Sequence, residues 1–363
     1  MLWLSGVRRV GKTMLCQKLD RVEYFDCELP RVRRQMEDPQ AFLEDLRGKR
    51  IVLDEIHRLA NPSQLLKIAA DHFPTIKVIA TGSSTLQASA KFKDTLTGRK
   101  KEIWLTPMMS TDLKDFGNTD FSHRFKVGGL PPFFLSDRPP EADYREWMDS
   151  YWAKDIQELF RLERRWSFQR FLELLFINSG GVFEATKYAQ PCEISRPTVS
   201  NYLNAMEATW VAHVVRPHST HRPREIVSAP KVYAFDTGFV CYFRGWQELR
   251  PEDMGLLWEH YVLNEIHSRS QARDIRYWRD KSGHEIDFVL VKRGRAPIAI
   301  ECKWSANAAK TRNLKAFRKR YPRGENWIVA RDIDRPFHRT EDDLKIDFIS
   351  LSDLSRRLEE IYP

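Results

Sequence analysis

The stretch Gly6-Val7-Arg8-Arg9-Val10-Gly11-Lys12-Thr13 decides the fold of the first third of this 363-residue chain. It matches the pattern G-x-x-x-x-G-K-[ST] at every defined position, and it follows a short apolar run, Leu2-Trp3-Leu4. A buried strand that leads into a glycine-rich turn and then a helix lets successive backbone N–H groups surround phosphate oxygens. Lys12 would add a positive charge at the β- and γ-phosphates, and Thr13 would add a hydroxyl ligand for Mg²⁺. The sequence therefore predicts a nucleoside-triphosphate-binding loop from Gly6 to Met14.

The length and composition of the chain favour several folded domains. A chain of 363 residues exceeds what one compact core usually holds, so two or three domains are expected. A hydrophobic content of 42% and an aromatic content of 12% favour folded, well-packed domains over a disordered chain. The formal net charge of +9 leaves two interpretations open. One is a soluble protein with an uneven surface, and the other is a protein with a polyanionic partner such as DNA.

Cysteine usage and hydropathy indicate the compartment. The five cysteines are scattered, with no C-x-x-C pair and no Cys/His pattern of zinc-site spacing, which favours a reducing environment. No apolar run approaches membrane-spanning length, and the first residues lead straight into the phosphate-binding loop instead of forming a signal peptide. We therefore expect a cytoplasmic protein with no membrane partner.

A second motif follows at Arg50-Ile51-Val52-Leu53-Asp54-Glu55, an apolar strand that ends in two carboxylates. Asp54 can hold the Mg²⁺ shell through water, and Glu55 can orient and polarise the attacking water. Many strands end in acidic residues, so the pattern gains its weight from the phosphate-binding loop that precedes it. Together the two motifs predict a site for ATP hydrolysis with Asp54 in the metal shell and Glu55 as the catalytic carboxylate.

Hydroxyl-bearing residues follow the next apolar strand, at residues 77–81. A polar residue at this strand end would lie between the two motifs and contact the γ-phosphate. We favour Ser83 for this role, with Thr81 as the alternative and a simple hydroxyl-rich turn as the structural explanation. A further strand is expected at residues 102–107. Five strands with helices between them predict an open parallel α/β sheet whose ligands bind beyond the carboxyl ends of the strands.

These motifs, together with Gly98-Arg99 and Gly128-Gly129-Leu130-Pro131, resemble a family of prokaryotic AAA+-like ATPases. The family is related to the STAND and archaeal-type ATPases and carries a C-terminal domain of unknown function. The resemblance extends over nearly the whole chain and implies ATP and Mg²⁺ as ligands. It implies that Arg99 places a guanidinium near the phosphates, in cis or from a neighbouring subunit of a homo-oligomer. Arg8 and Arg9 are alternatives, and a solvated surface position is the structural explanation for each. The family pattern also implies a further segment before the first strand.

The middle of the chain begins with an aromatic-rich helical region. Residues 118–165 resemble the small lid that follows the ATPase core in this family, and the core itself is assigned to residues 1–117. Tyr144, Trp147, Tyr151, Trp152 and Phe160 occur at helical spacing, which is typical of side chains packed in a core. The sequence therefore predicts a helical lid and no chemistry for its aromatic residues.

Residues 166–245 are expected to form a winged helix. Two apolar helical stretches precede a third helix, for which Ser195 is a suitable N-cap and Pro197 a suitable early residue. Strands at 210–216 and 231–235 flank a basic connection. The third helix would present groups that contact phosphates or base edges of DNA, although winged helices also serve as protein-packing modules. The candidate contact residues are Arg196, Thr198, Ser200, Asn201 and Asn204 on the helix and His218, His221, Arg222 and Arg224 in the connection.

The last part of the chain, residues 246–363, carries the spacing Asp287-x13-Glu301-x-Lys303, which resembles a PD-(D/E)xK nuclease core. Glu301 and Lys303 share one face of a strand, because side chains alternate with a period of two. A hairpin partner would bring Asp287 beside them. The two carboxylates would bind Mg²⁺, and Lys303 would position or deprotonate the hydrolytic water.

Two further acidic residues lie on the helix before these strands. Glu259 matches the position that nuclease folds of this type place next to the metal, and Glu265 is the weaker choice. The alternative to a metal site is a set of structural ion pairs with Lys303 and Lys292. Unpaired charges in apolar strands are costly, so a metal or such pairs must compensate them.

The sequence as a whole predicts an α/β protein. A P-loop parallel-sheet ATPase core with a helical lid is followed by a winged helix and a restriction-endonuclease-like α/β domain. ATP binding and hydrolysis would drive or gate an action on DNA. One alternative is a nucleotide-switched regulator that binds DNA or protein and cuts nothing. A second alternative is a signalling scaffold whose winged helix binds protein.

Overall fold

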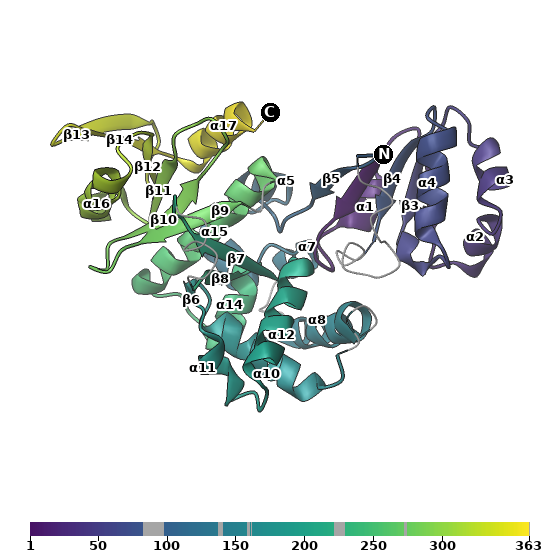
Figure 1. Ribbon diagram of the computed structural model, residues 1–363, viewed down its shortest axis with the longest axis horizontal. Coiled ribbons are helices and arrows are strands. Elements are labelled where there is room, and N and C mark those ends of the chain that lie inside the picture. Colours follow the sequence, from purple (N-terminus) through teal and green to yellow (C-terminus); the bar gives the residue numbers. More distant parts are fainter. Residues whose placement is uncertain are drawn as a thin grey trace.

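The computed structural model of the protein describes residues 1–82, 98–136, 141–157, 160, 162–220, 229–271 and 274–362. Two β-sheets lie on either side of a helical middle part (Figure 1). The purple and blue N-terminal part holds the first sheet, and the green and yellow C-terminal part holds most of the second. Among the described residues, none of the helices is long and apolar enough to cross a bilayer.

The first sheet is open and parallel, with the strand order β2-β3-β4-β1-β5. This confirms the predicted parallel α/β sheet in the first third of the chain. Because β4 lies between β1 and β3, its carboxyl end lies between the phosphate-binding loop and the two carboxylates after β3. The strands are β1 (Leu2–Ser5), β2 (Glu23–Asp26), β3 (Arg50–Asp54), β4 (Lys77–Thr81) and β5 (Lys101–Trp104).

Both faces of the first sheet are covered, which explains its continuous apolar strands. Leu4 and Val52 pack with Cys16 of α1 on one face. Trp3 and Leu53, their neighbours in sequence, point to the other face and pack against α2, α3 and α4. The helices of this part are α1 (Lys12–Gln17), α2 (Pro30–Gln35), α3 (Pro39–Glu44) and α4 (Pro62–His72), with a short 3-10 turn η1 (Ile56–Arg58) after β3.

The helical middle part is built on an aromatic core. Trp147, Tyr151 and Phe239 are buried and lie in ring contact, and Phe168 joins them through Tyr151. The aromatic residues that the sequence assigned to packing therefore belong to the core. The helices here are α5 (Ser110–Asp115), α6 (Phe121–Val127), α7 (Pro131–Phe134), α8 (Glu141–Ser150), the π-helical turn η4 (Tyr151–Gln157), α10 (Arg165–Ile177), α11 (Ala185–Ala189), α12 (Arg196–Ala208) and α14 (Thr237–Arg244).

The second sheet has the order β13-β14-β12-β11-β10-β9-β7-β8-β6. The hairpin β7–β8 follows helices α10 to α12, and β7 pairs in parallel with β9. One sheet thus continues across the predicted boundary between residues 245 and 246. Its strands are β6 (Gly181–Val182), β7 (Ala212–Pro217), β8 (Lys231–Ala234), β9 (Ile275–Arg279), β10 (Glu285–Leu290), β11 (Ile298–Lys303), β12 (Asn326–Ala330), β13 (Phe337–Glu341) and β14 (Leu344–Ile349). The remaining helices are α15 (Pro251–Ser270), η5 (Ala306–Ala308), α16 (Arg312–Arg320) and α17 (Leu351–Ile361).

Helix α15 connects the two sheets. At its C-terminal end, the side-chain amide of Gln271 accepts from the N–H of Trp104 (2.7 Å) and donates to its carbonyl (3.1 Å), as a neighbouring strand would. Six residues earlier, the buried carboxylate of Glu265 accepts from the N–H of Ser110 at the start of α5. Glu265, the weaker candidate for a metal ligand, therefore stabilises the packing of α15 on α5 and lies outside the nuclease-like cluster.

Candidate functional site

The loop between β1 and α1 depends on its two glycines. Gly6 has φ +145°, and a Cβ atom there would lie 2.5 Å from the carbonyl oxygen of Leu105. Gly11 has φ +105° and is the N-cap of α1. These backbone conformations are open to glycine and strained for other residues. The two glycines of the motif therefore allow the chain to pass from β1 into α1 through a short turn.

Lys12 lies inside this loop. Its side chain is buried, and Nζ donates to the carbonyl oxygens of Gly6 (2.7 Å) and Val7 (3.1 Å). Burial lowers the pKa of Lys12, and the nearby carboxylate of Glu55 counteracts part of that effect. The ammonium group is therefore held at the centre of the loop, where phosphate oxygens of a nucleotide would be its acceptors.

Asp54 contacts side chains from three separate segments of the chain. Its carboxylate is 2% exposed and accepts hydrogen bonds from three hydroxyl groups, those of Thr13 (2.8 Å), Tyr24 and Thr81. Carboxylate and hydroxyl oxygens are the hard ligands that Mg²⁺ prefers. The predicted pair Thr13 and Asp54 is in direct contact, so these two residues would offer a Mg²⁺ ion one hydroxyl and one carboxylate oxygen.

Glu55 follows Asp54 in a left-handed conformation, with φ +50°. Its N–H donates to the hydroxyl of Thr81 (3.1 Å), and its carboxylate lies 3.1 Å from Nδ1 of His57. Burial raises the pKa of Glu55, but the neighbouring His57 and the charge of Lys12 outweigh burial and hold that pKa at about 2. Glu55 is therefore ionised at neutral pH, as a water-orienting carboxylate must be.

Thr81 lies where a polar residue at the end of β4 was expected. It contacts both Asp54 and the N–H of Glu55, and it was the alternative to Ser83. Ser83 itself lies outside the described residues.

A cavity of about 970 Å³ opens beside the loop. Residues of the loop and Glu55 line one side, and α5, α7, α8 and η4 form the other. Two loop arginines pair with carboxylates across this cavity, Arg8 with Asp155 (3.1 Å) and Arg9 with Glu146. Met14, the last residue of the predicted loop, lines the cavity with a largely exposed side chain.

Arg99 lies elsewhere. Its Nε is 2.6 Å from Oδ1 of Asp71 at the end of α4, and within the described part of the chain it does not line the cavity. Its predicted contact with phosphates would therefore require a neighbouring subunit or a different side-chain position. That role stays a prediction.

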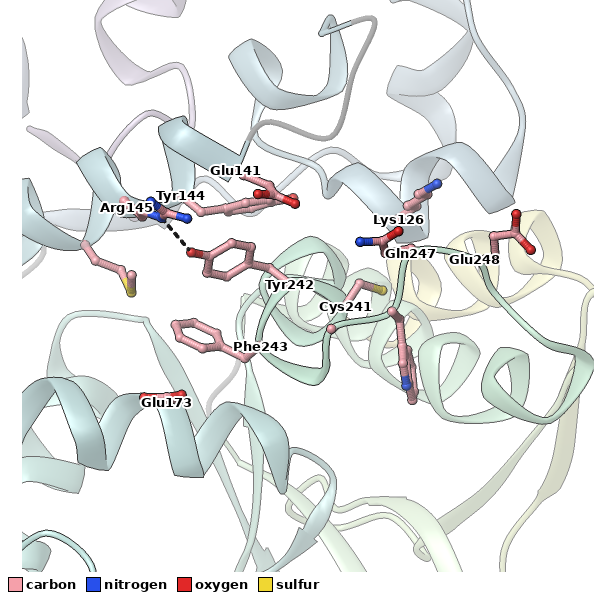
Figure 2. A pocket seen from close by; sticks show the side chains of 13 residues that line it. Lys126, Glu141, Tyr144, Arg145, Glu173, Cys241, Tyr242, Phe243, Gln247 and Glu248 are labelled. Atoms are coloured by element: carbon pink, nitrogen blue, oxygen red, sulfur yellow. Dashed lines mark hydrogen bonds between the residues drawn. The ribbon is translucent and has the colours of Figure 1, made fainter.

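Residues of α8 also line a second cavity, of about 1280 Å³ (Figure 2). Glu141, Arg145 and Met148 of α8 line the second cavity, opposite Lys126 of α6 and Tyr242 of α14. Nε of Arg145 donates to the Tyr242 hydroxyl at 3.4 Å. Residues of α8 thus contribute to two different cavities, with Glu146 facing the phosphate-binding loop.

The nuclease-like residues come together on β10 and β11. These strands are antiparallel with Phe288 opposite Ile300, so Asp287 and Glu301 occupy facing positions. Nζ of Lys303 lies 2.6 Å from Oε2 of Glu301 and 3.8 Å from Oδ2 of Asp287. Burial and the charge of Asp287 raise the pKa of Glu301 to about 7.

Glu259 reaches this cluster from α15 and is paired with a lysine that the sequence analysis missed. Nζ of Lys231, on β8, lies 3.2 Å from Oε1 of Glu259 and 2.6 Å from Oε1 of Glu285. Tyr233 also donates its hydroxyl to Glu259. Lys231 is the first residue of the otherwise apolar strand β8, and this isolated charge was the sequence feature that could have indicated an ion pair. Lys292, the other lysine considered for ion pairs, instead donates to the carbonyl oxygen of Ile361.

The cluster is therefore an arrangement of ion pairs in this structure. Within the described ranges, no group of three or more His, Cys, Asp or Glu side chains is placed to hold a metal ion. Lys231 and Lys303 lie between the carboxylates, so a Mg²⁺ ion would have to rely on Asp287 and Glu301 after Lys303 moves away from Glu301. The predicted three-carboxylate site with Glu259 stays a prediction.

The candidate DNA-contacting helix α12 presents a polar face. Val199, Tyr202 and Leu203 are buried, whereas the polar residues between them point outward. His218 does not extend from the surface as a wing residue would, because its ring packs 4.7 Å from that of Tyr321. The exposed residues of the helix are Arg196, Ser200, Asn201 and Asn204, Thr198 is half-buried, and His221, Arg222 and Arg224 lie outside the described residues.

Comparisons with known proteins divide the chain into three segments. Residues 1–113 match a family model described as an AAA domain. Residues 118–250 and 254–354 match two domains of unknown function, DUF8612 and DUF4143. An uncharacterized protein of Mycobacterium tuberculosis is 24% identical and covers 86% of this chain and 72% of its own length. An uncharacterized protein of Haemophilus influenzae is 21% identical, with 80% and 79% covered.

Similar solved structures are remote. The Walker-type ATPase PABY2304 of Pyrococcus abyssi is 15% identical, with a TM-score of 0.42 over 67% of this chain and 91% of that one. A STAND protein of Pyrococcus horikoshii with a tetratricopeptide repeat sensor is 11% identical, with a TM-score of 0.26 over 74% and 44%. Residues 1–113 are therefore similar to an AAA domain, and the loop that holds Lys12 and the contact of Thr13 with Asp54 are the features that a P-loop ATPase core would have.

Proposed function

We propose that the protein binds ATP with Mg²⁺, hydrolyses it, and uses this reaction to drive or gate an action on DNA. The observation that supports hydrolysis best is the convergence on Asp54. The hydroxyls of Thr13 and Thr81 both donate to this carboxylate, and the same Thr81 hydroxyl accepts from the N–H of Glu55. Thr13 and Asp54 of the proposed metal site, the proposed catalytic carboxylate Glu55 and Thr81, the alternative to Ser83 for the γ-phosphate contact, are thereby linked in one hydrogen-bonded unit.

Each residue has a defined task in this mechanism. Lys12 exchanges its loop carbonyl acceptors for β- and γ-phosphate oxygens. Thr13 and Asp54 would hold Mg²⁺, and the ion would neutralise charge on those phosphates. Glu55 accepts a hydrogen bond from the water that attacks the γ-phosphorus, and Thr81 fixes the backbone of Glu55 so that its carboxylate points at that water.

The experiment that tests this function is phosphate release from ATP by the whole chain, with and without duplex DNA. We expect Mg²⁺-dependent release that changes when DNA is added. No release under either condition would overturn the proposal. Release that is insensitive to DNA would favour the alternative of a regulator with a protein partner.

DNA contact through α12 is supported by its outward polar face and by the net charge of +9. If several phosphates are contacted, affinity for duplex DNA should fall about tenfold or more between 50 and 200 mM salt. Arg196→Ala should flatten this salt dependence. Arg47→Ala, which removes an exposed arginine paired with Glu44, is the matched control. Salt-independent binding, or none, would assign α12 to protein packing.

DNA cleavage by the C-terminal part is the second candidate function, favoured by the contact of Lys303 with both Asp287 and Glu301. These carboxylates supply hard oxygen ligands for Mg²⁺, and Lys303 would then be released to the scissile phosphate or the water. Nicking of supercoiled plasmid with Mg²⁺ or Mn²⁺ should vanish in Lys303→Ala and persist in Lys315→Ala, a lysine of α16 paired with Asp342. Absence of nicking by the unchanged protein would leave a domain that binds DNA or protein without cutting.

A further inference from the structure

One arginine of the phosphate-binding loop is fixed from the opposite wall of the cavity. Nε of Arg8 donates to Oδ2 of Asp155 at 3.1 Å, and Nε1 of Trp147 donates to the main-chain oxygen of Arg8 at 3.0 Å. Both Asp155 and Trp147 belong to the continuous segment α8–η4. The side chain and the backbone of Arg8 are therefore held by the same part of the molecule.

Asp155 is an unusual residue to find in this position. It is 5% exposed, and burial raises its pKa, which the charge of Arg8 partly offsets. A buried carboxylate is costly unless a cation pairs with it. It lies in the π-helical turn Tyr151–Gln157, a geometry that recurs at functional sites. The chain thus maintains a costly group beside Lys12 and Glu55, which line the same cavity.

The ion pair leaves part of the Arg8 guanidinium available. Asp155 engages Nε, and among the described residues no hydrogen bond from Nη1 or Nη2 of Arg8 is found. The two terminal nitrogens of a guanidinium can donate together to a phosphate group. Arg8 is therefore oriented by its inner nitrogen and can bind phosphate with its outer ones.

The carboxylates that pair with the other two candidate arginines in the described part of the chain are more exposed than Asp155. Arg9 pairs with Glu146, whose side chain is 63% exposed, and Arg99 pairs with Asp71 away from the cavity. The side chain of Asp155 is 8% exposed. Exposed ion pairs such as Arg9–Glu146 contribute little to fixing the position of a side chain, whereas a pair with a buried carboxylate holds its partner in place.

We propose that Arg8 is a catalytic residue that contacts the γ-phosphate in cis, and that Asp155 is the positioning residue that aims it. The inference rests on the proposed ATP hydrolysis. Negative charge on the γ-phosphoryl oxygens is stabilised in the transition state by a guanidinium that is already in place. Because Asp155 follows α8, the rate of hydrolysis depends on how the segment α8–η4 lies against the loop.

The first test is Arg8→Ala. We expect kcat to fall by on the order of 10³-fold, with ADP affinity nearly unchanged and with loss of tight binding of ADP with aluminium fluoride, which mimics the transition state. Arg145→Ala, which removes a side chain that lines the second cavity (Figure 2), should retain wild-type kcat. Wild-type kcat in Arg8→Ala would overturn the inference. Lack of hydrolysis by the unchanged protein would instead overturn the proposed function.

The second test separates positioning from simple structural support. Asp155→Asn keeps the shape but removes the charge, so kcat should fall about tenfold while KM changes little, and Asp155→Glu should restore part of the rate. In Arg8→Ala, adding Asp155→Asn should cause no further loss, because the two residues act as one unit. If the double variant instead lost kcat by the product of the two single-variant factors, the positioning role of Asp155 would be overturned.

Discussion

The phosphate-binding site and the carboxylate–lysine cluster of β10 and β11 both gather acidic side chains, but they compensate them differently. Asp54 is satisfied by neutral hydroxyl groups, and Lys12 donates to loop carbonyls. In the cluster, Glu259 and Glu301 are paired directly with lysines. Hydroxyls can stay in place when a cation binds, whereas a lysine must move. The first site is therefore ready for Mg²⁺, and the second requires a rearrangement.

The largest effect is expected at the loop. Lys12→Ala should abolish nucleotide binding, because it removes the cation that the loop holds for the β- and γ-phosphates. Binding of a fluorescent ATP analogue measures this directly. Lys49→Ala, an exposed lysine paired with Glu23, should bind as the unchanged protein does. Retained ATP affinity in Lys12→Ala would mean that nucleotide is bound by other groups.

The second effect concerns the lysine at the edge of the cluster. Lys231→Met should lower the free energy of unfolding by about 3–5 kcal/mol, because it removes the buried cation that pairs with Glu259, a half-buried carboxylate. Urea denaturation measures the change. A loss below about 1 kcal/mol would show that the carboxylates of the cluster do not depend on lysine, and the contrast with Asp54 would disappear.

Thr81→Val should cost less, about 1–3 kcal/mol, because it removes a neutral hydroxyl from Asp54 and from the N–H of Glu55. The same denaturation experiment checks this value. Thr81→Ser, which keeps the hydroxyl, is the control and should remain close to the unchanged protein. If Thr81→Val lowered the free energy of unfolding more than Lys231→Met does, the hydroxyl contacts of Asp54 would matter more for stability than the lysine pairing of the cluster.

The smallest effect is a difference in pH dependence. Since the pKa of Glu301 is raised to about 7, metal binding at the cluster competes with a proton and should strengthen roughly tenfold from pH 6 to 8. Since the pKa of Glu55 is held at about 2, this residue adds no pH dependence to ATP hydrolysis in that range. Mn²⁺ titration of Asp54→Asn, which lacks the carboxylate of the other proposed cation site, isolates the cluster, and the double variant Asp54→Asn with Glu301→Gln is the control. Binding that weakens with rising pH would contradict the raised pKa.

The sequence predicts local features well and long-range ones poorly. Lys12, Thr13 and Asp54 belong to short motifs whose geometry is set by the few residues around them. The contact of Thr81 with Asp54 depends on where β4 ends relative to β3, which no short pattern specifies. Lys231 and Asp155 were missed because their partners come from distant segments, and a π-helical turn has no distinct sequence pattern.

The decisive experiment is a single-turnover measurement with Glu55→Gln. ATP and Mg²⁺ are mixed with excess protein, and both bound nucleotide and released phosphate are followed. Glu55→Gln should bind ATP as tightly as the unchanged protein but release phosphate on the order of 10²-fold more slowly, because the acceptor for the attacking water is lost. Phosphate release at the normal rate would show that a different group orients the water and that Glu55 is not the catalytic carboxylate.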